Sequence, residues 1–192
     1  DAGKLGFGNP FQRVAYIESH DEERFLRELE QAGYSPEDAL RRDLTAVALT
    51  LTAPGMAMVY SGEEFGETAP KIVGPNPLHW SNLDQPAIRV LYEKFKNLSH
   101  LRTSHPALRS PEFRLQGNNV PDNVIVYERT ASNACVVVAV NFGRDEQTAA
   151  LTYPVGGMWT NVVGRECMTL NAGTTLNMTL APVDFAVMAT TP

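Results

Sequence analysis

A histidine and an aspartate, His20 and Asp21, stand side by side after an apolar run that is typical of a β-strand. The run includes Val14 to Ile17. A carboxylate can accept hydrogen bonds, and an imidazole can donate one. The active groups of barrels and doubly wound sheets gather where parallel strands end. We therefore expect a site at His20 and Asp21.

A second strand is expected from Met56 to Tyr60, and it also leads to glycine and two carboxylates, Glu63 and Glu64. Paired carboxyl groups can act as an acid and a base. They can also hold the end of the strand and its loops in place, as residues that orient the ligand-contacting side chains often do. On the residues alone, both interpretations stay open.

Two helices are expected between these strands. The first runs from about Glu22 to Gln31 and is closed by Gly33. The second begins after Ser35, whose hydroxyl can accept a hydrogen bond from the amide three residues on, and it ends at Pro54 and Gly55. A strand, helices and a second strand in this order predict a parallel crossover.

The pattern changes between Leu108 and Phe113, where short β-rich runs separated by turn residues begin. The expected strands are Val124–Arg129, Cys135–Phe142, Thr148–Tyr153, Thr174–Leu180 and Phe185–Ala189. Such runs are typical of an antiparallel sandwich. We expect an α/β part over residues 1–110 and an all-β part over residues 111–192.

The composition excludes several classes of partner. The 192 residues carry a formal net charge of −6, which argues against nucleic acid, because binding to phosphates requires clustered cations. No apolar run is long enough to cross a bilayer, so we expect no membrane partner. Cys135 and Cys167 are expected as free thiols, although one disulfide is compatible with the sequence. The cellular location stays open, with the cytoplasm preferred.

Two parallel strands with a few helices cannot form a closed sheet, and their edges would stay unpaired. Either upstream residues or a partner should therefore supply further strands. Pairing between two copies of the chain is a third explanation.

Several segments resemble the α-amylase family, glycoside hydrolase family 13. Tyr16–Arg24 resembles the motif of the family's seventh barrel strand, and Pro54–Gly66 resembles that of the eighth. Pro77–Asn82 is similar to a tryptophan-containing loop after that strand, Phe95–Leu108 to the last barrel helix, and the later strands to the β domain that follows. The resemblance implies the last two βα units of a (β/α)8 TIM barrel followed by an antiparallel β-sandwich.

The same resemblance implies roles for individual residues. Asp21 would stabilise the transition state by binding the sugar at which cleavage occurs, and His20, Tyr60 and Trp80 would contact substrate. Retaining cleavage also needs a nucleophile and an acid, which the family takes from its fourth and fifth strands. Neither strand is present, so the chain is expected to be inactive by itself. Ser19, where the family more often has Asn, resembles the branching-enzyme and related bacterial α-glucanase members, so the exact activity stays open between amylase and branching types.

Other interpretations of these residues stay open. Asp21 could cap the helix that follows, His20 could be a core histidine, and Trp80 could fill the core of a loop. Arg24 is expected either on an exposed helix face in a weak ion pair or, with Glu63 and Glu64, as a residue that supports the substrate-contacting side chains.

The chain could also be a non-enzymatic carbohydrate-binding or interaction module. Its all-β part would then hold glucan on an exposed platform of Tyr127, Tyr153 and Trp159. Acidic side chains do not show metal-ligand spacing, so no cofactor or metal is expected here. Calcium would belong to upstream parts of a full-length protein.

Overall fold

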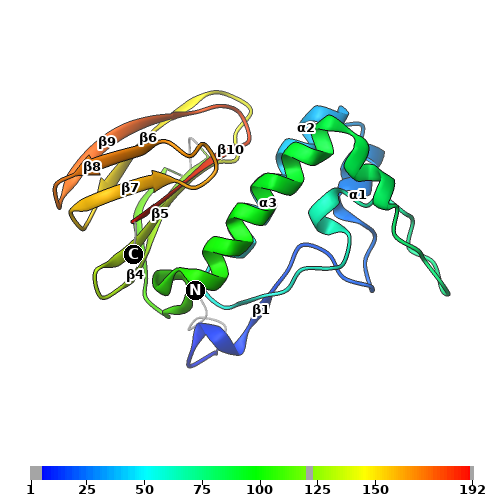
Figure 1. Cartoon of the computed structure of the whole chain (residues 1–192), viewed down its shortest axis with the longest axis horizontal. Coiled ribbons are helices and arrows are strands. Elements are labelled where there is room, and N and C mark those ends of the chain that lie inside the picture. The colour runs from blue at the N-terminus through cyan, green and yellow to red at the C-terminus, as the bar shows by residue number, and fades with distance from the viewer. Residues whose placement is uncertain (1–5, 120–122, 191–192) are drawn as a thin grey trace. The chain divides into compact units, whose positions relative to one another are not determined.

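The computed structural model describes residues 6–119 and 123–190. The chain divides into two compact units (Figure 1). The first contains residues 1–51 and 55–96, and the second contains residues 52–54 and 97–192. No helix within the described ranges has the length and apolar character that crossing a membrane requires.

The first unit contains a short parallel pair of strands, β1 (Val14–Ala15) and β2 (Met56–Ala57). Helices α1 (Phe25–Gln31) and α2 (Pro36–Thr52) lie between them in the sequence. The parallel direction confirms the predicted crossover. Both strands are shorter than expected. Among the described strands each pairs only with the other, so no third strand extends the pairing.

Short 3₁₀ helices and one long helix complete this unit. They are η2 (Pro10–Gln12), η3 (Glu63–Phe65), η4 (Trp80–Asp84) and α3 (Pro86–Ser104), the last of which continues into the second unit. The amide of Asp38 donates to Ser35 Oγ, as predicted for the start of α2. Helix α1 begins later than the expected Glu22, and its first amide, that of Phe25, donates to Glu18.

The second unit is a β-sandwich preceded by the short helix α4 (Pro106–Arg109). Its strands are β3 (Phe113–Asn119), β4 (Val124–Ala131), β5 (Ala134–Asn141), β6 (Gln147–Tyr153), β7 (Gly157–Asn161), β8 (Cys167–Leu170), β9 (Thr174–Leu180) and β10 (Asp184–Thr190). A six-stranded antiparallel sheet has the order β3-β4-β5-β10-β7-β8, and β6 pairs with β9 in a second sheet (Figure 1). All five strands expected here are confirmed, while β3, β7 and β8 were not predicted.

The core of the sandwich contains the aromatic residues that the alternative interpretation places on its surface. Tyr153 and Trp159 are fully buried and pack edge to face with ring centroids 4.8 Å apart, and Tyr127 is buried as well. An exposed stacking platform of these three residues is therefore wrong. Both cysteines are free thiols, as expected, with Cys135 buried and Cys167 exposed.

A buried arginine of β4 holds the start of the sandwich together. Arg129 donates to the carbonyl oxygens of Thr52, Leu108, Ser110 and Glu112. Burial, together with the charge of Arg102, lowers the pKa of Arg129 to about 10. Arg129 thus serves as a structural hydrogen-bond donor rather than a surface charge.

Candidate functional site

The candidate site lies in the first unit, where the chain leaves β1. Glu18 and Ser19 are buried, whereas His20 and Asp21 are exposed, with side-chain exposures of 79% and 76%. His20 Nε2 lies 3.5 Å from Asp21 Oδ1. The interpretation of His20 as a core histidine is therefore wrong. Asp21 does not cap α1 either, because the N-cap position is Arg24.

The loop that carries Asp21 is held by its neighbours. Ser19 Oγ accepts a hydrogen bond from the amide of Asp21 at 3.1 Å and also contacts the carboxylate of Glu22. Lys71 donates through its Nζ to the carbonyl of Asp21 and through its amide to Glu23. These bonds fix the backbone of Asp21 and leave its carboxylate toward solvent.

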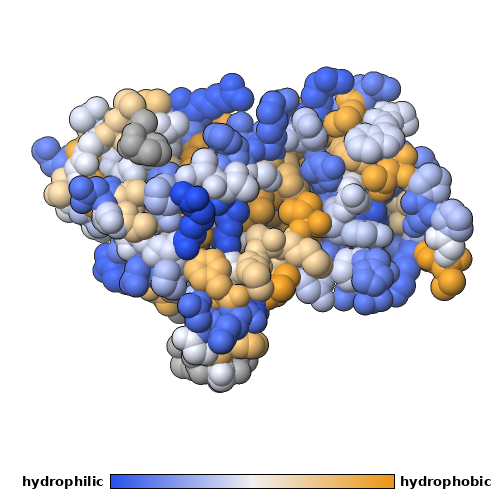
Figure 2. Space-filling view, turned by 60° about the horizontal axis from the view of Figure 1, so that its bottom comes forward, coloured by the Kyte–Doolittle hydropathy of each residue, from blue (hydrophilic) through white to orange (hydrophobic). Residues whose placement is uncertain are grey.

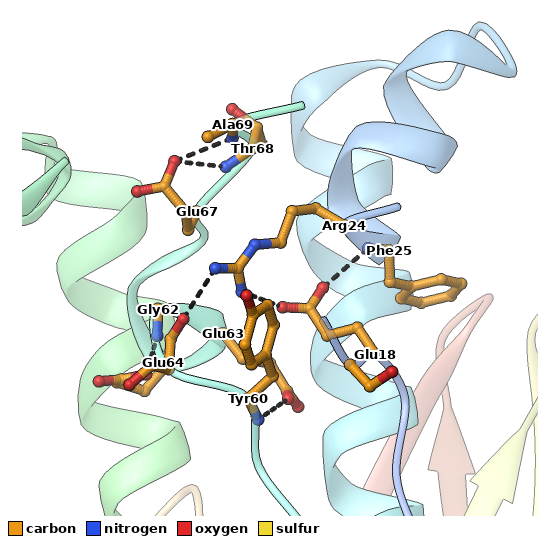
Figure 3. A network of polar contacts seen from close by, with 12 residues as sticks. Glu18, Arg24, Phe25, Tyr60, Gly62, Glu63, Glu64, Glu67, Thr68 and Ala69 are labelled. Carbon is orange, nitrogen blue, oxygen red and sulfur yellow. Dashed lines mark hydrogen bonds and ion pairs between the residues drawn. The ribbon is translucent and has the colours of Figure 1, made fainter. Parts of the chain in front are cut away.

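Arg24 connects the two segments that follow the parallel strands (Figure 3). Its guanidinium donates to Glu18 Oε1 at 2.6 Å and to the carbonyl of Ser61 at 2.8 Å, and it lies 4.0 Å from the centre of the Tyr60 ring. The expectation of an exposed, weakly paired arginine is wrong, because Arg24 and Glu18 are both buried. An Arg24 fixed on three sides keeps the ends of β1 and β2 next to each other.

The carboxylates after β2 differ in environment. Glu63 is buried and accepts the amide of Tyr60, while Glu64 accepts the amide of Gly62 (Figure 3). Burial raises the pKa of Glu63 to about 7, since the charges of Glu18 and Glu64 add to it and only the Tyr60 amide and Arg24 oppose it. Both residues hold the backbone of this turn.

Asp43 of α2 is a third buried carboxyl in this region. Burial raises its pKa well above the usual range, and the nearby charges of Glu63 and Glu18 raise it further. Its Oδ2 has no hydrogen-bond partner among the described residues. The buried surroundings and these two charges therefore favour the protonated form of Asp43. No group of three metal-ligating side chains occurs within residues 6–119 and 123–190.

Trp80, the other expected substrate contact, is exposed at the start of η4. One side of its ring packs on the buried Phe65, with centroids 4.8 Å apart. The interpretation of Trp80 as the filling of a loop core is therefore wrong.

Hydrophobic areas interrupt the mostly hydrophilic surface seen in Figure 2.

Sequence reasoning missed the burial of three carboxyl groups in this unit, those of Glu18, Asp43 and Glu67. Glu18 stands two positions before His20, so the motif contained it. Asp43 stands four positions before the buried Val47, and a carboxylate within an apolar helix face was the available signal. Glu67, which is also buried, had no such signal because it lies alone in a loop.

Residues 115–187 match the family model of the maltogenic amylase C-terminal domain. The sequence matches the C-terminal portion of the α-amylase family, glycoside hydrolase family 13.

Curated α-amylase family proteins match over most of this chain. A beta/alpha-amylase of Paenibacillus polymyxa is 26% identical over 90% of the chain, and α-amylase MalA of Haloarcula japonica is 29% identical over 85%. The matched segments span 14% and 22% of those two proteins. The chain therefore matches only a small part of each α-amylase family relative.

A solved α-amylase family structure supports the fold. The γ-cyclodextrin glucanotransferase of alkalophilic Bacillus clarkii superposes on 100% of this chain and 28% of its own, with a TM-score of 0.74 and 21% identity. At this identity the likeness concerns the fold.

Proposed function

We propose that this chain forms the C-terminal part of an α-glucan-active retaining glycoside hydrolase or transglycosylase. Residues 1–110 would be the last two βα units of its (β/α)8 barrel, and residues 111–192 its C-terminal β-sandwich. Relatives named as amylases and cyclomaltodextrin glucanotransferases support the substrate class. So do solved relatives described in complex with maltotriose and maltotetraose.

One observation carries the assignment of the site. Arg24 joins Glu18 to the carbonyl of Ser61, so the ends of both parallel strands are held together while His20 and Asp21 stay exposed. Asp21 would bind the hydroxyl groups of the distorted sugar and stabilise the oxocarbenium-like transition state. His20 and Tyr60 would bind the same substrate. Arg24, Glu63 and Glu64 would position them.

The nucleophile and the general acid would come from upstream barrel strands that this chain does not contain. Exposed hydrophobic side chains support such a covering partner, because Val14 and Met56 on the strand pair and Val59 just after it are exposed. Calcium, if the full-length protein binds it, would belong to those upstream parts. A second copy of this chain is the other candidate to cover the strands.

Two measurements test the proposal. Incubation of this chain with maltoheptaose should release no product, because the bond-breaking carboxylates are absent. In the full-length protein that carries these residues, Asp21→Asn should lower kcat about 100-fold or more. Product analysis would then separate hydrolysis from branching.

A further inference from the structure

The loop between β2 and η4 contains a carboxylate and an imidazole that the proposed function does not use. Glu67 is buried, and it accepts hydrogen bonds from the amides of Thr68, Ala69 and His79 at 3.0, 2.9 and 2.6 Å (Figure 3 shows the first two). It also lies 3.0 Å from the ring Nδ1 of His79. One buried side chain therefore joins the two ends of the segment between η3 and η4.

The charge of Glu67 determines which nitrogen of His79 carries a proton. Burial acts to raise the pKa of Glu67, but the bonds from His79 and Ala69 outweigh it and leave the pKa below its usual value. An ionised carboxylate can only accept hydrogen bonds. His79 Nδ1 must therefore be the donor, and in the neutral ring Nε2 keeps a free lone pair.

The other half of the His79 ring faces solvent. Its side chain is 60% exposed, and no hydrogen bond to Nε2 exists among the described residues. The next residue is Trp80, which is 63% exposed and packs on Phe65. An oriented imidazole and a supported indole thus stand next to each other in the chain.

The same loop is bound to the segment that carries Asp21. Lys71 lies between Glu67 and His79 in the sequence and bonds to Glu23 and to the carbonyl of Asp21. The segment that contains Glu67 and His79 is therefore hydrogen-bonded to the segment that contains Asp21.

We propose that Glu67, His79 and Trp80 form a binding point for one pyranose unit of an α-glucan. The sugar ring would lie against the indole of Trp80, and His79 Nε2 would accept a hydrogen bond from one of its hydroxyl groups. Glu67 is a positioning residue, because it acts by orienting His79. The sugar class rests on the proposed function, whereas the orientation of His79 rests on the contacts above.

Titration of the whole chain with maltoheptaose tests the site through tryptophan fluorescence. The sequence has two tryptophans, and the exposed Trp80 should respond while the buried Trp159 should not. Saturable binding is expected. His79→Asn should weaken it about tenfold, because asparagine can still donate to Glu67 but has no group at the Nε2 position. The matched control is His100→Ala, on the exposed side of α3, which should bind as the wild type does.

Glu67→Gln tests the positioning role and should also weaken binding. Because this variant could loosen the loop, the imidazole nitrogen spectrum of the wild type provides a second measurement. Protonated Nδ1 and unprotonated Nε2 are expected in the neutral ring. The opposite tautomer, wild-type binding by His79→Asn, or no binding by the wild type would each overturn the inference.

The outcomes separate this inference from the proposed function. If His79→Asn binds normally while Asp21→Asn abolishes turnover in the full-length protein, the proposed function stands and the binding point fails. If Asp21→Asn keeps normal turnover while His79→Asn loses maltoheptaose, the binding point stands and the assignment of Asp21 fails.

Discussion

Arg24 and Glu18 form an ion pair of 2.6 Å in which both side chains are buried. Arg24→Met should leave the Glu18 carboxylate without its cation and lower the free energy of unfolding by about 3 kcal/mol or more. Urea unfolding measures this change. Lys96→Met, which breaks the exposed pair with Glu93, is the control and should cost less than about 1 kcal/mol. Equal losses in the two variants would mean that the buried pair is not important for stability.

The stability of the first unit should depend on the protonation of Glu63. Its pKa is about 7 in the folded chain and about 4.3 in an unfolded one, so the folded state binds the proton more tightly. The contribution of the Glu63 proton to stability is complete below pH ~4.3, declines as the pH rises, and is lost above pH ~7, a change of up to about 4 kcal/mol.

Glu63→Gln isolates this contribution from that of other groups. Asp43, whose pKa is also raised, acts in the same direction, so the variant should flatten the decline without abolishing it. Urea unfolding between pH 4.5 and 7.5 provides the comparison. An unchanged slope in Glu63→Gln would show that Glu63 is ionised throughout this range.

Arg129 should be among the most important residues of the second unit. Replacing it by Met removes the donors to four backbone carbonyls and should cost about 3 kcal/mol or more. Arg129→Lys should recover only part of this, since one ammonium cannot replace a planar guanidinium. Arg144→Met, at an exposed position, is the control and should have little effect on thermal unfolding. A similar melting temperature for both Met variants would contradict the role of Arg129.

Tyr153→Phe should leave the sandwich as stable as before or stabilise it by up to about 1 kcal/mol. The hydroxyl of Tyr153 is buried without a hydrogen-bond partner among the described residues, and burial raises its pKa. Removing an unpaired buried polar group relieves its desolvation cost while the ring keeps its contact with Trp159. A clear loss of stability on calorimetry would mean that this hydroxyl has a partner.

Much of the fold could be predicted from local patterns. Alternating and continuous apolar runs located five strands of the sandwich, and Ser35 located the start of α2. Strands β7 and β8 have mostly exposed or half-buried residues, so their hydrophobic signal was weak. Strand β7 pairs with β10 and β8 pairs with β7, and no local pattern contains these long-range contacts.

The candidate site was predicted less completely than the fold. His20, Asp21 and Trp80 were identified from motifs, and their exposure agrees with contact to a ligand. The environment of Arg24 could not be predicted, because its bond to Ser61 connects residues 37 positions apart. Glu67 and His79 were missed for the same reason, since their pairing depends on the path of the loop between them.

The turnover of Asp21→Asn tests the central claim most directly. In the full-length protein, with maltoheptaose as substrate, we predict a fall in kcat of about 100-fold or more, because the amide cannot offer the negative charge that the transition state requires. Glu37→Gln, at an exposed position of α2, is the control and should change kcat far less. A kcat for Asp21→Asn within a few-fold of the wild type would contradict the account.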